Sequence, residues 1–136
     1  MTTKYGGKHR VVLIDGDGVG PEMMFHVKET LRHVRAPVDF EEINLNSKTA
    51  TDSLINQTIL ALKRNGVGLN GIIETDHHNV NSFSINVLLM QKLDLYANVL
   101  RCKSLNNIKT RHQNIDILII RENTEGEYAH LEVIFI

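Results

Sequence analysis

The sequence predicts an α/β protein in which a mainly parallel sheet is flanked by helices. Two observations support this class: apolar runs of strand length alternate with helical patterns, and glycine or proline marks many of the boundaries. With 136 residues, of which 42% are hydrophobic and 23% charged, the chain is long enough to bury a core. It contains no internal repeat and no low-complexity linker, so we expect residues 1–136 to form a single unit.

The first strand is predicted over residues 10–15, and a helix follows the glycine-rich segment 16–20. Pro21 suits the first helical turn, where its missing N–H needs no partner, and Glu22 complements the N-terminal dipole. The side chains expected to face the sheet recur at helical spacing: Met24, Val27, Leu31 and Val34.

A second strand, a second helix and a third strand come next. Residues 38–45 alternate in polarity except at residues 41–42, where we expect a bulge. A helix capped within residues 51–53 is ended by Gly66. Residues 67–74 are predicted to form the third strand.

The second half of the chain continues the alternation. Ser82 or Ser84 is predicted to cap a helix over residues 85–93, and a strand follows over residues 94–102. Residues 115–120 are almost all β-branched or aliphatic, which is typical of a strand covered on both faces in a parallel sheet.

Whole-chain properties exclude several classes of function. The net charge of -1 argues against nucleic acid or an anionic membrane as the main partner. Cys102 is the only cysteine, which favours a reducing compartment, and the apolar runs are too short to span a membrane. Residues 1–10 contain neither a signal peptide nor an arginine-rich transit segment. Residues 131–136 form a strand-like run with no turn after it, which indicates a truncated chain.

The glycines of segment 16–20 follow a strand and precede a helix, as in a dinucleotide-binding turn, and Asp39 follows about twenty residues later. The spacing, however, is GxGxG and not GxGxxG, and Asp15 and Asp17 would repel a pyrophosphate. We therefore predict a structural turn that packs the helix tightly against the sheet.

The seven histidines do not form a recognisable metal site. None pairs with another at i, i+4 on one helix beside a carboxylate, and the single cysteine excludes a cysteine cluster. Adjacent histidines such as His77 and His78 usually point into water. We predict no metal site within the chain.

Thr75, Ser84 and Asn86 lie on the loop after the third strand and in the first turn of the next helix, a favourable position for an anion. Arg121 ends the last predicted strand and could converge on the same crevice. Two hydroxyls, an amide and a guanidinium suit a carboxylate-bearing small molecule. The equally open alternative is that Ser82 or Ser84 simply caps the helix.

Residues 121–128 form a dense polar cluster directly after the strand over 115–120. Ligands of open α/β sheets bind beyond the carboxyl ends of the strands, so Arg121 and Tyr128 fit an active-site loop. An ordinary solvated loop is the equally open alternative.

Four segments resemble the isocitrate/isopropylmalate dehydrogenase family of decarboxylating 2-hydroxyacid dehydrogenases: GDGVGPE at 16–22, DLYANV at 94–99, CKSL at 102–105 and IRENTEGEY at 120–128. The second and fourth resemble NAD-dependent isocitrate dehydrogenases, and VDFEE, IET and TRHQNIDILI resemble their regulatory, gamma-type subunits. The resemblance implies the N-terminal portion of the family's large domain, running into the start of its small domain. The C-terminal remainder of the fold is expected to be absent, so the fold would be incomplete.

The resemblance also implies an activity, namely oxidation of isocitrate by NAD and decarboxylation to 2-oxoglutarate with Mg²⁺ or Mn²⁺ in the mitochondrial matrix. Gamma-type subunits assemble with a catalytic alpha-type subunit and bind the activator citrate, with ADP adjacent. By position, Thr75, Ser84, Asn86 and Arg121 would contact the tricarboxylate, and Tyr128 matches the family's catalytic tyrosine.

Two substitutions depart from the family pattern. Met90 stands where the motif has an arginine, and Leu100 stands where catalytic relatives have a second one, with Arg101 on the opposite strand face. Each arginine–carboxylate contact contributes roughly 1.5–3 kcal/mol. Losing two should weaken a tricarboxylate by about 10²- to 10⁴-fold. Leucine at position 100 is expected of a gamma-type subunit, whereas methionine at position 90 is not.

The family's catalytic lysine and metal-binding aspartates are expected beyond Ile136. We therefore expect no complete NAD or metal site in this chain and no catalysis by the chain alone. The leading hypothesis is a regulatory subunit-like chain. The alternatives are a non-enzymatic fragment that only docks on the catalytic subunit and an unstable fragment with exposed sheet edges.

Overall fold

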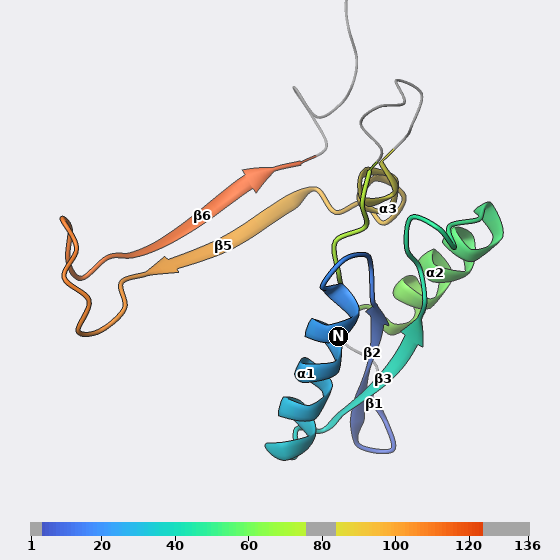
Figure 1. Ribbon diagram of the computed structural model, residues 1–136, viewed down its shortest axis with the longest axis horizontal. Coiled ribbons are helices and arrows are strands. Elements are labelled where there is room, and N and C mark those ends of the chain that lie inside the picture. Colours follow the sequence, from blue (N-terminus) through green and yellow to red (C-terminus); the bar gives the residue numbers. More distant parts are fainter. Residues whose placement is uncertain (1–3, 76–83, 124–136) are drawn as a thin grey trace, which may run out of the picture. The chain divides into compact units, whose positions relative to one another are not determined.

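The computed structural model describes residues 4–75 and 84–123. By its internal contacts the chain divides into two compact units, Met1–Leu93 and Asp94–Ile136 (Figure 1). The sequence predicts a single unit that begins in the large domain of the family fold and runs into its small domain. Both parts of this expectation stay predictions.

The first unit is built on the central strand β2 (Lys8–Ile14). β3 (Val38–Ile43) pairs in parallel along one edge of β2, and β4 (Gly68–Asn70) pairs in parallel with its last three residues. The short β1 (Lys4–Tyr5) is antiparallel to the start of β2. The mainly parallel sheet of the predicted α/β class is thus confirmed.

Three helices are described in this unit: α1 (Gly20–His33), α2 (Asp52–Asn65) and α3 (Ile85–Lys92). Figure 1 shows α1 and α2 on opposite sides of the strands. The chain passes from β2 through α1 to β3, and then from β3 through α2 back across β2 to β4, so the two connections run in opposite directions along the sheet. Right-handed connections that run in opposite directions place their helices on opposite faces of the sheet. The buried core lies among β2, α2, α3 and the loops between them: Val12, Ile14, Leu45, Ile55, Ile59, Ala61, Ile73 and Leu89.

The capping residues explain where α2 begins and ends. The side chain of Thr51 accepts a hydrogen bond from Leu54 N at 3.3 Å, as expected of an N-cap. Gly66 adopts the left-handed conformation at φ 71° and donates its N–H to Leu62 O. Both boundaries agree with the sequence prediction.

Three details of the predicted elements were wrong. Val34 is 64% exposed, because α1 ends one residue before it. β3 runs through its register with β2 without a bulge, because Glu41 occupies the inward position as an ion-paired side chain. β4 is shorter than the predicted strand over residues 67–74, because the chain passes the end of β2 at Ile14 and has no strand left to pair with.

The second unit contains an antiparallel pair, β5 (Ala97–Lys103) and β6 (Asp116–Glu122), joined by the loop 104–115. Ser104 closes the loop: its N–H donates to Ile115 O, and its Oγ accepts from Ile115 N, both at 2.8 Å. Arg101 and Asp116 form a two-pronged ion pair at 2.7 and 2.8 Å.

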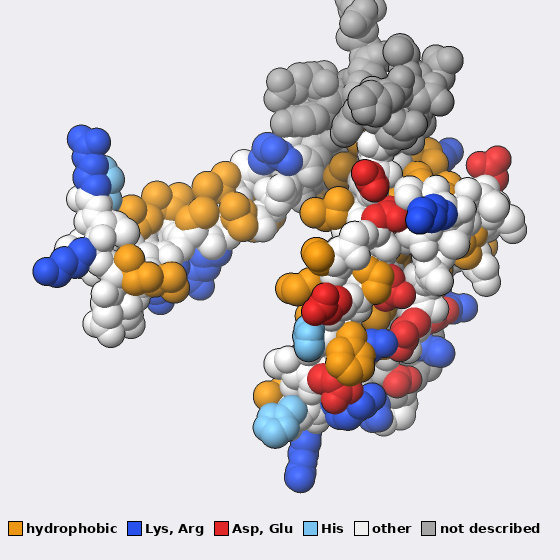
Figure 2. Space-filling model, in the orientation of Figure 1, with side chains coloured by type: hydrophobic (Ala, Val, Ile, Leu, Met, Phe, Trp, Pro, Cys, Tyr) orange, Lys and Arg blue, Asp and Glu red, His pale blue; other side chains and the backbone are white. Residues whose placement is uncertain are grey.

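The predicted strand over residues 115–120 is present as β6, but its predicted environment was wrong. β6 pairs antiparallel with β5, and its side chains are exposed, with Ile117 at 52% and Ile120 at 66%. Figure 2 shows hydrophobic side chains along this ribbon. No other described element of the unit covers either face of this strand pair. The expected strand over residues 131–136 lies outside the described residues.

Candidate functional site

The carboxyl ends of β2, β3 and β4 lie at one edge of the sheet of the first unit, since the three strands are parallel. Each is followed by a loop. The segment 16–20 after β2 is the structural turn that the sequence predicted: Gly16 has φ +73°, and a Cβ on Gly20 would lie 2.2 Å from Asp15 O. Only glycine permits this close approach between the start of α1 and the end of β2.

Asp17, at the centre of this turn, joins all three loops. Its Oδ2 accepts hydrogen bonds from Ser47 N and Glu74 N, and its Oδ1 accepts one from Ser47 Oγ, all at 2.9 Å. Partial burial opposes ionisation of Asp17, but these hydrogen bonds and the nearby charge of Lys48 outweigh it and lower the pKa. The carboxylate is therefore charged at neutral pH, and both of its oxygens accept hydrogen bonds.

Thr75 and Ser84 are brought together by the loop after β4 and the first turn of α3. Thr75 Oγ1 donates to Ser84 Oγ at 3.2 Å. Ser84 is the N-cap residue of α3, yet its side chain makes no capping hydrogen bond to the helix. The N–H groups of the first turn therefore lack the usual side-chain acceptor, and the dipole of the helix favours an anion at this end.

Asn86 binds the backbone of the loop after β4. Its Nδ2 donates to Ile73 O at 2.6 Å, and its Oδ1 accepts from Ile73 N at 3.4 Å. Ile73 is 1% exposed, so these contacts satisfy backbone groups that water does not reach. In this conformation both polar ends of the Asn86 side chain are engaged by the protein.

The other predicted contacts belong to the second unit. Arg121 lies on β6, exposed, and its Nε donates to Asn123 Oδ1 at 3.2 Å. Tyr128 lies outside the described residues. The structure thus brings Thr75, Ser84 and Asn86 together, whereas the convergence of Arg121 and Tyr128 on them stays a prediction.

The two departures from the family pattern also fall in separate units. Met90 is partly buried on α3, four residues after Asn86 and therefore on the same side of the helix. Leu100 is 56% exposed on β5, and Arg101, on the opposite face of that strand, is paired with Asp116.

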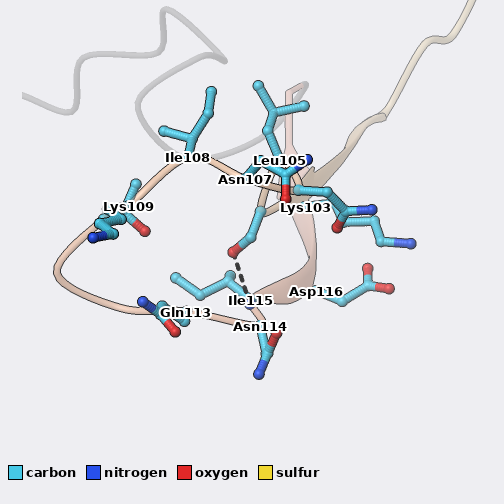
Figure 3. A pocket seen from close by; sticks show the side chains of 12 residues that line it. Lys103, Leu105, Asn107, Ile108, Lys109, Gln113, Asn114, Ile115 and Asp116 are labelled. Atoms are coloured by element: carbon cyan, nitrogen blue, oxygen red, sulfur yellow. Dashed lines mark hydrogen bonds between the residues drawn. The ribbon is translucent and has the colours of Figure 1, made fainter.

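A separate hollow of about 780 Å³ lies within the loop that joins β5 to β6. Figure 3 shows Lys109 on one side of this loop and Lys103 with Asp116 on the other. These charged side chains do not converge on one point, and none of the predicted site residues lines the hollow.

The described residues do not fit the cofactors of the family. Among residues 4–75 and 84–123, no three His, Cys, Asp or Glu side chains gather into a site for a cation. The glycine turn presents Asp17, an ionised carboxylate, where a dinucleotide-binding turn would hold a pyrophosphate. None of the described helices has the length and apolar character needed to cross a membrane.

Comparison with known proteins agrees with this fold. The family model described as isocitrate/isopropylmalate dehydrogenase matches residues 10–134. The chain therefore belongs to the isocitrate/isopropylmalate dehydrogenase family.

Its relatives include mitochondrial gamma subunits of NAD-dependent isocitrate dehydrogenase. The subunit from Bos taurus is 55% identical over 96% of this chain, and the one from Homo sapiens is 54% identical over the same share. Subunit 1 of the enzyme from Schizosaccharomyces pombe is 46% identical over 95% of this chain. The chain spans about a third of the length of these relatives.

Two solved structures share the fold. The TT0538 protein from Thermus thermophilus has a TM-score of 0.82 and 28% identity, covering 96% of this chain and 28% of its own. Isocitrate dehydrogenase from Methylococcus capsulatus has a TM-score of 0.73 and 27% identity, covering 94% of this chain and 39% of its own.

The sequence predicts Thr75, Ser84 and Asn86 as a group but does not identify Asp17 as the residue that joins the three loops. In the sequence, Asp17 is only a charge that would repel a pyrophosphate. The hydrogen-bond donors to Asp17 lie 30 and 57 residues away along the chain, so no local signal in the sequence identifies them.

Proposed function

We propose that this chain is a regulatory, gamma-type component of a mitochondrial NAD-dependent isocitrate dehydrogenase and does not catalyse by itself. It acts beside a catalytic alpha-type subunit that carries out the oxidation with NAD and Mg²⁺ or Mn²⁺. The observation that carries the proposal is the Thr75–Ser84 hydroxyl pair at the N-terminus of α3, in a chain 55% identical to a gamma subunit.

The ligand proposed for this site is citrate, with ADP as a second effector bound nearby. Two hydroxyls and the free end of a helix dipole suit a carboxylate, and, by resemblance to the family, Arg121 and Tyr128 are further proposed contacts. Because arginine is replaced at Met90 and Leu100, binding is expected to be weaker than in relatives that keep these residues.

The decisive experiment is a thermal shift of the full chain with citrate, comparing wild type with Met90→Arg. The restored guanidinium, on the same side of α3 as Asn86, should tighten citrate by about 10- to 100-fold, the equivalent of one charge-assisted hydrogen-bonded pair. Gln91→Arg, at the exposed neighbouring position of α3, is the matched control and should leave the shift unchanged. Equal stabilisation of both variants, or none of either, would refute the assignment of the pocket.

Reconstitution with an alpha-type subunit separates regulation from docking. Citrate- or ADP-dependent activation of the complex supports the regulatory role. The second candidate, docking without ligand, is favoured by Met90 and predicts co-purification with the alpha-type subunit but no activation. Lack of a cooperative melt in the isolated chain would instead favour the unstable fragment.

A further inference from the structure

We propose that Asp17 is a positioning residue for the anion site, holding the loop that carries Thr75 through the backbone N–H of Glu74. The inference rests on the proposed function of that site. Asp17 makes its contacts across long stretches of sequence, with Ser47 30 residues away and Glu74 57 residues away. Its role therefore exists only in the folded sheet.

The loop 71–75 is anchored residue by residue up to Thr75. Gly71 N donates to Ile14 O at 2.8 Å, and Asp17 N donates to Ile72 O at 2.9 Å. The side chain of Asn86 then binds both backbone groups of Ile73.

Glu74 N, bound by the carboxylate of Asp17, is the last of these anchors. The next residue is Thr75, whose hydroxyl meets Ser84. Among the described residues, losing the Asp17 contact would leave Ile73 as the last backbone anchor before Thr75. The distance between Thr75 Oγ1 and Ser84 Oγ, and with it the geometry offered to a carboxylate, then depends on Asp17.

Asp17 itself is not a ligand-binding group. Its two oxygens already accept three hydrogen bonds from protein donors. The hydrogen bonds from two N–H groups and a hydroxyl offset part of the negative charge that Asp17 would otherwise present to an anion. Asp17 thus influences affinity only through the residues it holds.

The two contacts of Asp17 can be tested separately. Ser47→Ala removes the hydroxyl donor and leaves the Glu74 contact intact. Asp17→Asn removes the charge, so that the hydrogen bond from Glu74 N to the remaining oxygen is no longer charge-assisted. Asp39→Asn, which removes the charge of an exposed carboxylate on β3, is the matched control. Citrate affinity by calorimetry, melting temperature and amide exchange at Glu74 and Thr75 are measured for each full-length variant.

The positioning role predicts that Asp17→Asn weakens citrate binding by about fivefold or more, the difference between a charge-assisted and a neutral hydrogen bond to Glu74 N. Exchange at Glu74 and Thr75 should rise in the same variant. Ser47→Ala and Asp39→Asn should keep the citrate Kd within about twofold of wild type. If citrate affinity instead falls in step with melting temperature in both Asp17→Asn and Ser47→Ala, Asp17 is only structural and the proposal is overturned.

Two further outcomes are informative. If wild type binds no citrate, the proposed function fails, and amide exchange alone tests the positioning role of Asp17. Faster exchange at Glu74 in Asp17→Asn than in Ser47→Ala supports that role, whereas equal exchange in the two variants overturns it. If Asp17→Asn does not melt cooperatively, Asp17→Glu replaces it. That variant keeps the charge but moves it by one methylene, so it should fold and still bind citrate more weakly than wild type; unchanged affinity would overturn the proposal.

Discussion

Replacing Glu41 by glutamine should destabilise the first unit measurably, because this carboxylate joins β3 to the end of α2. Glu41 is hydrogen-bonded to Arg64, accepts a hydrogen bond from Asn65 Nδ2 at 2.8 Å and lies 3.6 Å from Arg10 Nε. The hydrogen bond from Arg64 is the main cause that lowers the Glu41 pKa, the one from Asn65 adds to it, and partial burial opposes both. The Glu41 side chain is 23% exposed.

The loss of unfolding free energy depends on which hydrogen-bonding groups each Glu41 variant leaves unpaired. A hydrogen bond to a charged group contributes about 1.5–3 kcal/mol, and the 56% exposure of Arg64 reduces this by solvent screening. Asn65 Oδ1 is buried with no partner among the described residues, so a rotated Asn65 amide can accept from the amide of Glu41→Gln. We therefore expect a loss of about 1 kcal/mol for Glu41→Gln and about 2–3 kcal/mol for Glu41→Ala.

Urea unfolding followed by far-UV circular dichroism measures these losses, with Glu42→Gln as the matched control. Glu42 is the next residue of β3, on the opposite face, and its carboxylate, paired with Lys28 Nζ at 2.9 Å, is 53% exposed. That control should change stability by less than about 0.5 kcal/mol. A loss in Glu41→Gln no larger than in Glu42→Gln would refute the argument.

The pH dependence gives a second check on Glu41. Its folded pKa lies below the ordinary value of 4.5, so its contribution is fully present above that pH and is lost as the pH falls through the folded value. The difference between wild type and Glu41→Gln should therefore shrink between about pH 5 and pH 3. A constant difference over that range would show that Glu41 does not stabilise the fold through its charge.

Two other predictions concern the loop after β4. Gly71→Ala should lower the free energy of unfolding by about 2 kcal/mol or more, since the added Cβ would lie 2.1 Å from a backbone carbonyl oxygen. Gly68→Ala should lower it less, because its Cβ would meet a flexible leucine side chain at 2.3 Å. Urea unfolding midpoints measure the difference between the two variants. Asn86→Ala should cost about 1–3 kcal/mol, because it unpairs both backbone groups of the buried Ile73. Faster hydrogen exchange over residues 71–75 is the measurement for Asn86→Ala, and unchanged protection would contradict it.

Local signals were sufficient for much of the fold. Helical periodicity, a cap within residues 51–53 and Gly66 after the helix place α2 to within about two residues, because capping involves only neighbours in sequence. The strand before the glycine turn was equally clear from its apolar run. Where the prediction failed, the cause was non-local: Glu41 takes an inward position only because Arg64 and Asn65 arrive from α2.

The sequence by itself determined the α/β class, the family and the candidate anion-binding residues, since these depend on residue types and spacings along the chain. The tertiary structure alone decided that Asp17 joins three loops and that Asn86 holds Ile73, because those partners meet only when parallel strands end at the same edge. It also decided that the apolar strand β6 is exposed within its unit. Composition predicts how much a strand would gain from being covered, but only the arrangement of neighbours determines whether anything covers it.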